Sequence, residues 1–142
     1  MRKLAVIMAA LGIAGPALAE YPLKGDEHII CTGMQYYECI IDKGCQQVAP
    51  AEISAPTLFE IDLGSGEINS RAGPEDERKT SIEKRRIIDS KIILQGAEDG
   101  LEQVRDGLGW TAAITTDTGI MSATASTDGA GFVIMGACRP LK

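Results

Sequence analysis

The sequence predicts an all-β protein: an antiparallel meander of about eight strands that closes as a small barrel or sandwich and contains two disulfides. Apolar runs of about five to eight residues recur along the chain, and turn-forming residues separate them at intervals of about ten. That spacing is typical of hairpins joined in series. The chain also has four cysteines, an even number that favours disulfide pairs.

The first part of the chain, residues 1–19, has the charged start, apolar centre and small-residue end of a secretory signal peptide. Arg2 and Lys3 supply the positive charge. The uncharged stretch that follows is 16 residues long, which is shorter than the roughly 20 residues that span a bilayer. We therefore expect cleavage after Ala19, no membrane span in the cleaved chain, and a single β-rich domain, residues 20–142, that is periplasmic or secreted.

The four cysteines are Cys31, Cys39, Cys45 and Cys138. Four cysteines allow three pairings, and the sequence alone does not choose among them. We favour Cys39–Cys45 as a local crosslink and Cys31–Cys138 as a crosslink between the two ends of the domain. The alternative is a zinc site that uses Cys31, Cys39, Cys45 and His28. It is disfavoured because the spacing contains no Cys-x-x-Cys pair and because exported proteins meet oxidising conditions.

The N-terminal part of the domain, residues 20–50, is polar and cysteine-rich, and its paired apolar residues indicate short strands. Turns are expected at Met34-Gln35 and at 42–44, where polar residues and a glycine interrupt the apolar pairs. Residues 48–56 contain two prolines and are expected to form a connector.

A regular hairpin pattern follows this connector. Residues 57–63 alternate between the two faces of a strand, residues 64–66 form a glycine-containing turn, and residues 67–71 form the returning strand. The charged segment 72–79 is expected to be a solvated loop. Residues 80–88 are expected to form a polar strand, because their isoleucines do not make a helical stripe.

The C-terminal half continues the alternation of strands and turns. Residues 91–96 are expected to form a strand, and residues 100–108 are compatible with one helical turn. Three further strands are expected, separated by turns at 117–119 and 127–129: residues 109–115, 120–126 and 131–138.

Asp117, Thr118 and Gly119 form the tripeptide Asp-Thr-Gly, which carries the catalytic aspartate in aspartic proteases. Such an enzyme needs two carboxylates about 3 Å apart that share one proton. Only 23 residues follow Gly119, too few for the flap and supporting segment of a retroviral-type protease. The tripeptide is therefore predicted to be a turn between two strands, with glycine at a position of positive φ.

Other catalytic patterns are not recognisable in the sequence. The single histidine, His28, is expected to be a surface residue near the start of the domain, so no base is available for a serine or cysteine nucleophile. We expect no catalytic, cofactor-binding or metal-binding residues. Phe59, Trp110 and Phe132 are expected to lie in the core.

Charge limits the range of partners. The formal net charge is −6, and an acidic chain lacks the basic face that binds nucleic acid. The segment Arg78–Arg86 is a local cluster of basic residues in this acidic protein. Such a cluster is either a solvated face balanced by neighbouring carboxylates or a docking site for an anionic partner, and the first interpretation is favoured.

One long segment resembles a known group of proteins. GWTAAITTDTGIMSATASTDGAGFVIMGAC, residues 109–138, and the cluster of Cys31, Glu38-Cys39 and Cys45 resemble small exported proteins of unknown function from Gram-negative bacteria. The resemblance implies a periplasmic β-domain and no known activity, and it transfers no functional residue. In architecture the expected domain is also similar to the periplasmic inhibitors of C-type lysozymes.

These observations favour a non-catalytic binding module for an envelope protein or a small ligand. The alternatives are an inhibitor barrel that acts on lysozyme or another hydrolase, a subunit of an envelope complex, and an acid-dependent hydrolase that uses some of the many carboxylates.

Overall fold

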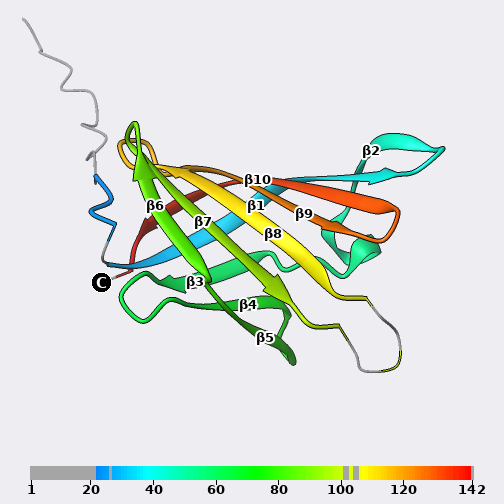
Figure 1. Cartoon of the computed structure of the whole chain (residues 1–142), viewed down its shortest axis with the longest axis horizontal. Coiled ribbons are helices and arrows are strands. Elements are labelled where there is room, and N and C mark those ends of the chain that lie inside the picture. The colour runs from blue at the N-terminus through cyan, green and yellow to red at the C-terminus, as the bar shows by residue number, and fades with distance from the viewer. Residues whose placement is uncertain (1–21, 26, 101–102, 104–105, 142) are drawn as a thin grey trace, which may run out of the picture.

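The computed structural model describes residues 22–25, 27–100, 103 and 106–141, which form one antiparallel sheet curled as a half-barrel (Figure 1). The expected signal peptide and cleavage site lie outside the described residues, and so do residues 101–102 and 104–105 of the expected helical turn at 100–108. The strands are β1 (His28–Ile40), β2 (Gly44–Val48), β3 (Leu58–Asp62), β4 (Glu67–Gly73), β5 (Asp76–Ser81), β6 (Lys84–Ile88), β7 (Lys91–Glu98), β8 (Leu108–Thr115), β9 (Ile120–Thr127) and β10 (Ala130–Pro140).

The prediction of an all-β antiparallel protein is confirmed, but the described residues form ten strands and not about eight. Along the sheet the order is β5-β4-β3-β1-β10-β9-β8-β7-β6, and β2 pairs with β1 outside this path. The connector between β2 and β3 contains a short 3-10 helix, η1 (Pro50–Ile53). Most neighbours in the sheet are consecutive in sequence. The meander is interrupted at β1, which pairs with β3 on one side and with the last strand, β10, on the other.

The expected loop at 72–79 is wrong at both of its ends, and only Pro74 and Glu75 at its centre form a turn. β4 extends to Gly73, and β5 (Asp76–Ser81) begins directly after the turn and pairs with β4. The side chains of β5 alternate between half-buried and exposed positions. The charges are satisfied within the sheet, since Lys79 Nζ lies 2.8 Å from Glu67 Oε1. A run of charged residues can therefore form a strand when its neighbours carry opposite charges.

The expected turn at Met34-Gln35 is also wrong. Both residues lie inside β1, where the register against β10 shifts between Gly33 and Gln35 in a β-bulge. An extra residue in one strand bends it without ending it. The bulge divides β1 into a first half that pairs with β3 and a second half that pairs with β2. The second half projects with β2 beyond the curled part of the sheet (Figure 1).

Both favoured disulfides form. Cys31 and Cys138 are directly opposite each other on β1 and β10, and they join residues 107 positions apart. Cys39 and Cys45 are opposite each other on β1 and β2, and they close the projecting hairpin. The first disulfide is buried in the core, whereas Cys45 is exposed.

One end of the half-barrel is filled by apolar side chains, and we call it the plugged end (left in Figure 1). Leu23, Ile29, Leu63, Ile92 and Ile114 are each 4% exposed or less and belong to one core cluster. Burial of side chains of this kind contributes about 1.5–3 kcal/mol each to stability, before conformational entropy is counted.

The segment that precedes β1 bridges several strands at the plugged end. The Leu23 N–H donates to the carbonyl of Thr116 at 2.8 Å, after β8. The Arg85 guanidinium on β6 donates to the carbonyls of Gly25 and Leu63. Residues far apart in the sequence are thereby fixed around one apolar centre, and the plugged end is held by both packing and hydrogen bonds.

Candidate functional site

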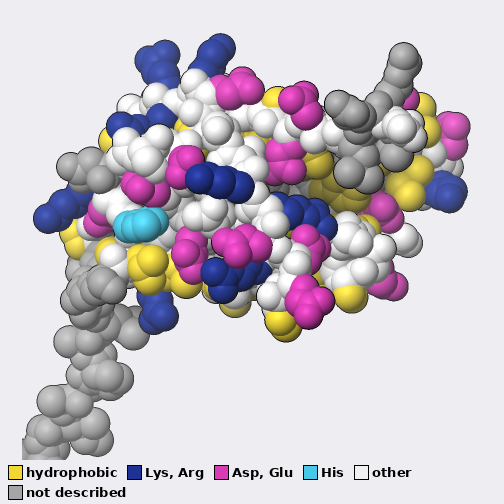
Figure 2. Space-filling model, turned by 90° about the horizontal axis from the view of Figure 1, so that it is seen from below, with side chains coloured by type: hydrophobic (Ala, Val, Ile, Leu, Met, Phe, Trp, Pro, Cys, Tyr) yellow, Lys and Arg dark blue, Asp and Glu magenta, His cyan; other side chains and the backbone are white. Residues whose placement is uncertain are grey.

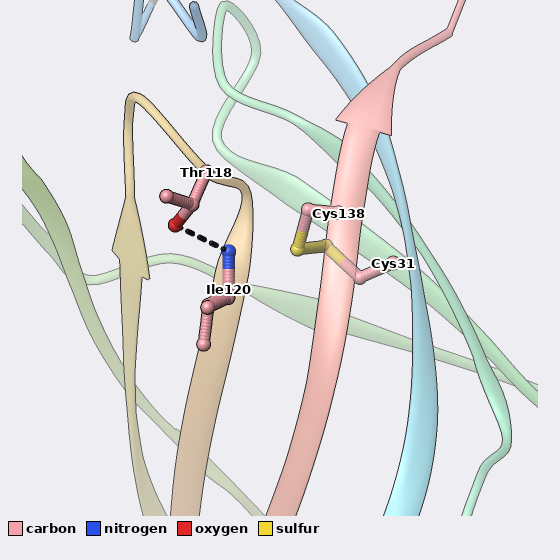
Figure 3. Close-up of a disulfide and its surroundings, with 4 residues drawn as sticks. All are labelled: Cys31, Thr118, Ile120 and Cys138. Atoms are coloured by element: carbon pink, nitrogen blue, oxygen red, sulfur yellow. Dashed lines mark hydrogen bonds between the residues drawn. A yellow bond between two sulfur atoms is a disulfide. The ribbon is translucent and has the colours of Figure 1, made fainter. Parts of the chain in front are cut away.

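The Asp-Thr-Gly tripeptide lies in the turn between β8 and β9, as predicted. Asp117 is exposed and accepts a hydrogen bond from the hydroxyl of Thr116 at 3.0 Å. The Thr118 hydroxyl accepts a hydrogen bond from the Ile120 N–H at 3.3 Å, beside the Cys31–Cys138 disulfide (Figure 3). These are the contacts of a turn, in which the threonine satisfies the backbone.

Gly119 explains why this turn needs its glycine. Its φ is +68°, and a Cβ atom would lie 2.1 Å from the carbonyl oxygen of Cys138. The Cys138 N–H also donates to the Gly119 carbonyl at 2.7 Å. The tripeptide therefore anchors the turn against β10, and its sequence is accounted for by backbone conformation and close packing.

His28 is exposed at the start of β1, as expected (cyan in Figure 2). In the part of the chain that the structure describes, no group of three or more histidine, cysteine, aspartate or glutamate side chains is arranged to hold a metal ion. All four cysteines are in disulfides. The alternative prediction that the cysteines bind zinc is therefore wrong, because they are bonded to one another.

The basic residues between Arg78 and Arg86 do not share one surface. Arg78 is half-buried and bonds Asp76, Lys79 pairs with Glu67 on another side, and Arg85 donates to backbone carbonyls at the plugged end. Figure 2 shows acidic and basic side chains mixed over the face seen from below. Pairing with neighbouring groups therefore accounts for these three residues.

The other end of the half-barrel contains a cavity of about 140 Å³, and we call it the cavity end (right in Figure 1). In Figure 2 apolar side chains are visible in a hollow between charged ones. Seven strands and the β2–β3 connector contribute to the walls, which are mostly apolar: Pro56, Phe59, Ile61, Ile68, Ser70, Arg78, Thr80, Glu98, Leu108, Trp110, Ala112, Met121, Ala123, Thr124, Ala125 and Ile134. Concave apolar sites with a few polar groups are typical of small-molecule binding.

A charged group forms part of the cavity wall. The Arg78 guanidinium donates to both carboxylate oxygens of Asp76, from Nε at 3.0 Å and from Nη2 at 2.8 Å. These bonds lower the pKa of Asp76 and raise the pKa of Arg78, to which the carboxylate of Glu98 adds a smaller attraction. Arg78 is thus held in place by one carboxylate and lies in the field of a second.

Trp110, the single tryptophan of the chain, also lines the cavity. It lies opposite Gly96 on β7, where an added Cβ would be 2.4 Å from indole Cζ2 and 2.7 Å from the Ser81 carbonyl oxygen. The indole therefore covers a position that only glycine can occupy. Its buried Nε1 has no hydrogen-bond partner among the described residues, and neither has the buried hydroxyl of Thr80.

The sequence predicted Phe59 and Trp110 as core residues, and both do pack against the core cluster, but they also border the cavity. It did not predict the polar residues of the cavity wall. Thr80 and Arg78 face inward because β5 is a strand, whereas the sequence suggested a loop for most of this segment. Their spacing of two residues was the signal that could have revealed them.

Comparison of the chain with protein-family models, with curated proteins and with solved structures finds no match. The resemblance to exported Gram-negative proteins therefore stays a prediction. Over the described residues, no helix has the length and apolar character needed to cross a membrane.

Proposed function

We propose that this protein is a non-catalytic binding protein that holds a small, mostly apolar ligand in the cavity between the strands. The single observation that carries this proposal is the cavity itself, which is bordered by inward-facing side chains of seven strands. We further propose that it acts in the periplasm or outside the cell after removal of residues 1–19. The two disulfides support that location, because such bonds persist in oxidising compartments.

The volume limits the size of the ligand. An engineered apolar cavity of about 150 Å³ in another protein accommodates benzene. The present cavity, at about 140 Å³, suits one ring or a short alkyl chain. Small side chains, among them Ala112, Ala123 and Ala125, provide this space where larger ones would fill it. A larger ligand would place one apolar group inside and the rest at the surface.

The proposal includes closure of the curled sheet into a barrel around the ligand. β5 and β6 are joined by only two residues, Ile82 and Glu83. The Ile82 N–H donates to Gly66 at 2.8 Å beside β4, and the Glu83 N–H donates to Gln95 on β7 at 2.9 Å. The segment from β5 to β6 thus pairs with β4 at one edge of the sheet and with β7 at the other edge. This arrangement supports closure of the sheet into a barrel.

The test measures uptake of ethylbenzene by isothermal titration calorimetry, with the fluorescence of Trp110 as a second signal. Ala125→Phe places a ring inside the cavity, and Ala137→Phe is the matched control because Ala137 is exposed on β10. We expect binding by the wild type and by the control, and none by Ala125→Phe. Failure of the wild type to bind, or equal binding by Ala125→Phe, would contradict the proposal.

A further inference from the structure

Two hydrogen-bond donors in the cavity wall lack partners in the part of the chain that the structure describes. The indole Nε1 of Trp110 and the hydroxyl of Thr80 are both buried, and neither bonds to any described residue. A buried polar group without a partner destabilises the fold, because it has lost its hydrogen bonds to water and gained none in return. Both residues line the same cavity, so a ligand placed there could accept hydrogen bonds from them.

The position of the indole is fixed by its surroundings. Its ring lies against Gly96 on the neighbouring strand, beside the backbone of Ser81 at the end of β5. Thr80 directly precedes Ser81, so both donors lie in the corner where β5, β7 and β8 approach one another. A wall group held in this way is prepared for its acceptor before the ligand arrives, which reduces the entropy lost on binding.

The charge of Arg78 is less available to a ligand. Asp76 already accepts two of its hydrogen bonds, and Glu98 also lines the cavity. An anionic ligand would compete with the first carboxylate and be repelled by both. A neutral acceptor meets no such repulsion, because it draws only on the two uncharged donors.

We infer that the ligand is an uncharged molecule with a ring-sized apolar body and one carbonyl-type acceptor, such as a small ketone, ester or amide. This inference rests on the proposed function, and it adds the chemical class of the ligand. The apolar body occupies the space between the alanine-rich strands. The carbonyl oxygen accepts from Trp110 Nε1 and, through its second lone pair, from the Thr80 hydroxyl.

Three probes of similar size separate the possibilities: ethylbenzene without an acceptor, acetophenone with a neutral carbonyl, and the benzoate anion. We expect the wild type to bind acetophenone about tenfold more tightly than ethylbenzene, since one net hydrogen bond corresponds to about that ratio. Benzoate should bind more weakly than acetophenone. Affinities are measured by calorimetry at neutral pH.

Two variants remove the donors. Trp110→Phe keeps an aromatic ring without the N–H, and Thr80→Val keeps the branched shape without the hydroxyl. Thr111→Val is the matched control, because Thr111 lies on β8 but not in the cavity wall. We expect Trp110→Phe to lose most of the preference for acetophenone while its affinity for ethylbenzene changes less than about threefold. Thr80→Val should lose part of the preference, and the control none.

The outcomes distinguish this inference from the proposed function. If ethylbenzene and acetophenone bind the wild type equally, the cavity binds ligands but the inferred acceptor is wrong. If benzoate binds most tightly, the ligand is an anion and the inference is overturned. If none of the three probes binds, both the inference and the proposed function are wrong. Thr80→Val provides the test independently should Trp110→Phe not fold, as judged by circular dichroism.

Discussion

The plugged end and the cavity end are built by the same strands but in opposite ways. β8 shows the contrast within eight residues: Ile114 is fully buried at the plugged end, whereas Leu108 and Trp110 border the cavity. β7 repeats it, with Ile92 fully buried at one end and Glu98 at the cavity wall. The sheet therefore concentrates its apolar packing at one end and leaves space at the other.

The difference teaches how a small β-protein can keep a cavity and still be stable. Apolar packing, the Cys31–Cys138 disulfide and the bridging segment around Leu23 all act on the plugged end. The walls of the cavity end share residues such as Ile61 and Met121 with the core cluster, but they also carry small residues, charged groups and two donors without partners among the described residues. Sites with unsatisfied polar groups reduce stability, so the remainder of the core must offset that loss.

The largest expected effect comes from removing the disulfide nearest the plugged end. Replacing Cys31 and Cys138 by alanine releases a crosslink between residues 107 positions apart, and the chain-entropy relation predicts a loss of about 4–5 kcal/mol in the free energy of unfolding. Replacing Cys39 and Cys45, six positions apart, should cost about 2 kcal/mol by the same relation. Urea denaturation of both double variants measures the two losses.

The second double variant serves as the control for the first, because each removes one disulfide between paired strands. Equal losses, or a larger loss for the projecting hairpin, would contradict the view that stability is concentrated at the plugged end. Ethylbenzene binding gives a second comparison. The variant without the Cys39–Cys45 disulfide should retain it, since neither cysteine lines the cavity.

Local sequence signals predicted the parts of the fold that depend on local physics. The turn at Gly119 and the hairpin around residues 64–66 follow from glycine and from the alternation of apolar residues beside it. β5 was missed because its residues are charged, and strand formation there depends on partners such as Glu67 that only the folded sheet brings opposite them. The bulge at Gly33–Gln35 was missed for a related reason, since polar residues at a bulge resemble those of a turn.

The cavity could not be predicted from the sequence, because it depends on what seven strands fail to fill. Ala123 lines the cavity, but an alanine in the sequence does not indicate whether its side chain faces a tightly packed core or an open space. Trp110 was correctly expected to pack inward, but the missing partner of its N–H depends on the strand arrangement. A cavity is a property of the assembled sheet, so its position appears only when side-chain volumes are placed together.

A second prediction compares two truncations on one strand. Ile114→Ala removes a fully buried side chain at the plugged end, and we expect it to cost about 3 kcal/mol of unfolding free energy. Leu108→Ala truncates a half-buried side chain that already borders the cavity, and it should cost less than about 1 kcal/mol. Thermal or urea denaturation of both variants measures the ratio. A loss at Leu108 as large as that at Ile114 would show that the cavity end is packed as tightly as the plugged end.

The smallest expected effect concerns acid and compares one carboxylate from each end. Asp62 accepts hydrogen bonds from the N–H groups of Gly64 and Ser65 at 2.9 and 3.0 Å. Hydrogen bonding to Ser65 is the main cause that lowers the pKa of Asp62, and the bond from Gly64 contributes less. The pKa of Asp76 is lowered chiefly by its hydrogen bond with Arg78. A lowered pKa in the folded state stabilises the protein above the unfolded value, about 3.9, and this stabilisation is lost as the pH falls through the folded value.

Asp62→Ala and Asp76→Asn should therefore each be less stable than the wild type at pH 7, and the differences should disappear in strong acid. The loss of unfolding free energy in each of these two variants should be smaller than the losses predicted for the disulfide and isoleucine variants, because solvent screens the two carboxylates. The affinity for benzoate then distinguishes the carboxylate at the cavity end from the one at the plugged end. Asp76→Asn releases Arg78 from its partner and should increase benzoate affinity, whereas Asp62→Ala should leave it unchanged. If Asp76→Asn gains no benzoate binding at neutral pH, then pairing with Asp76 is not what makes the cavity select neutral ligands.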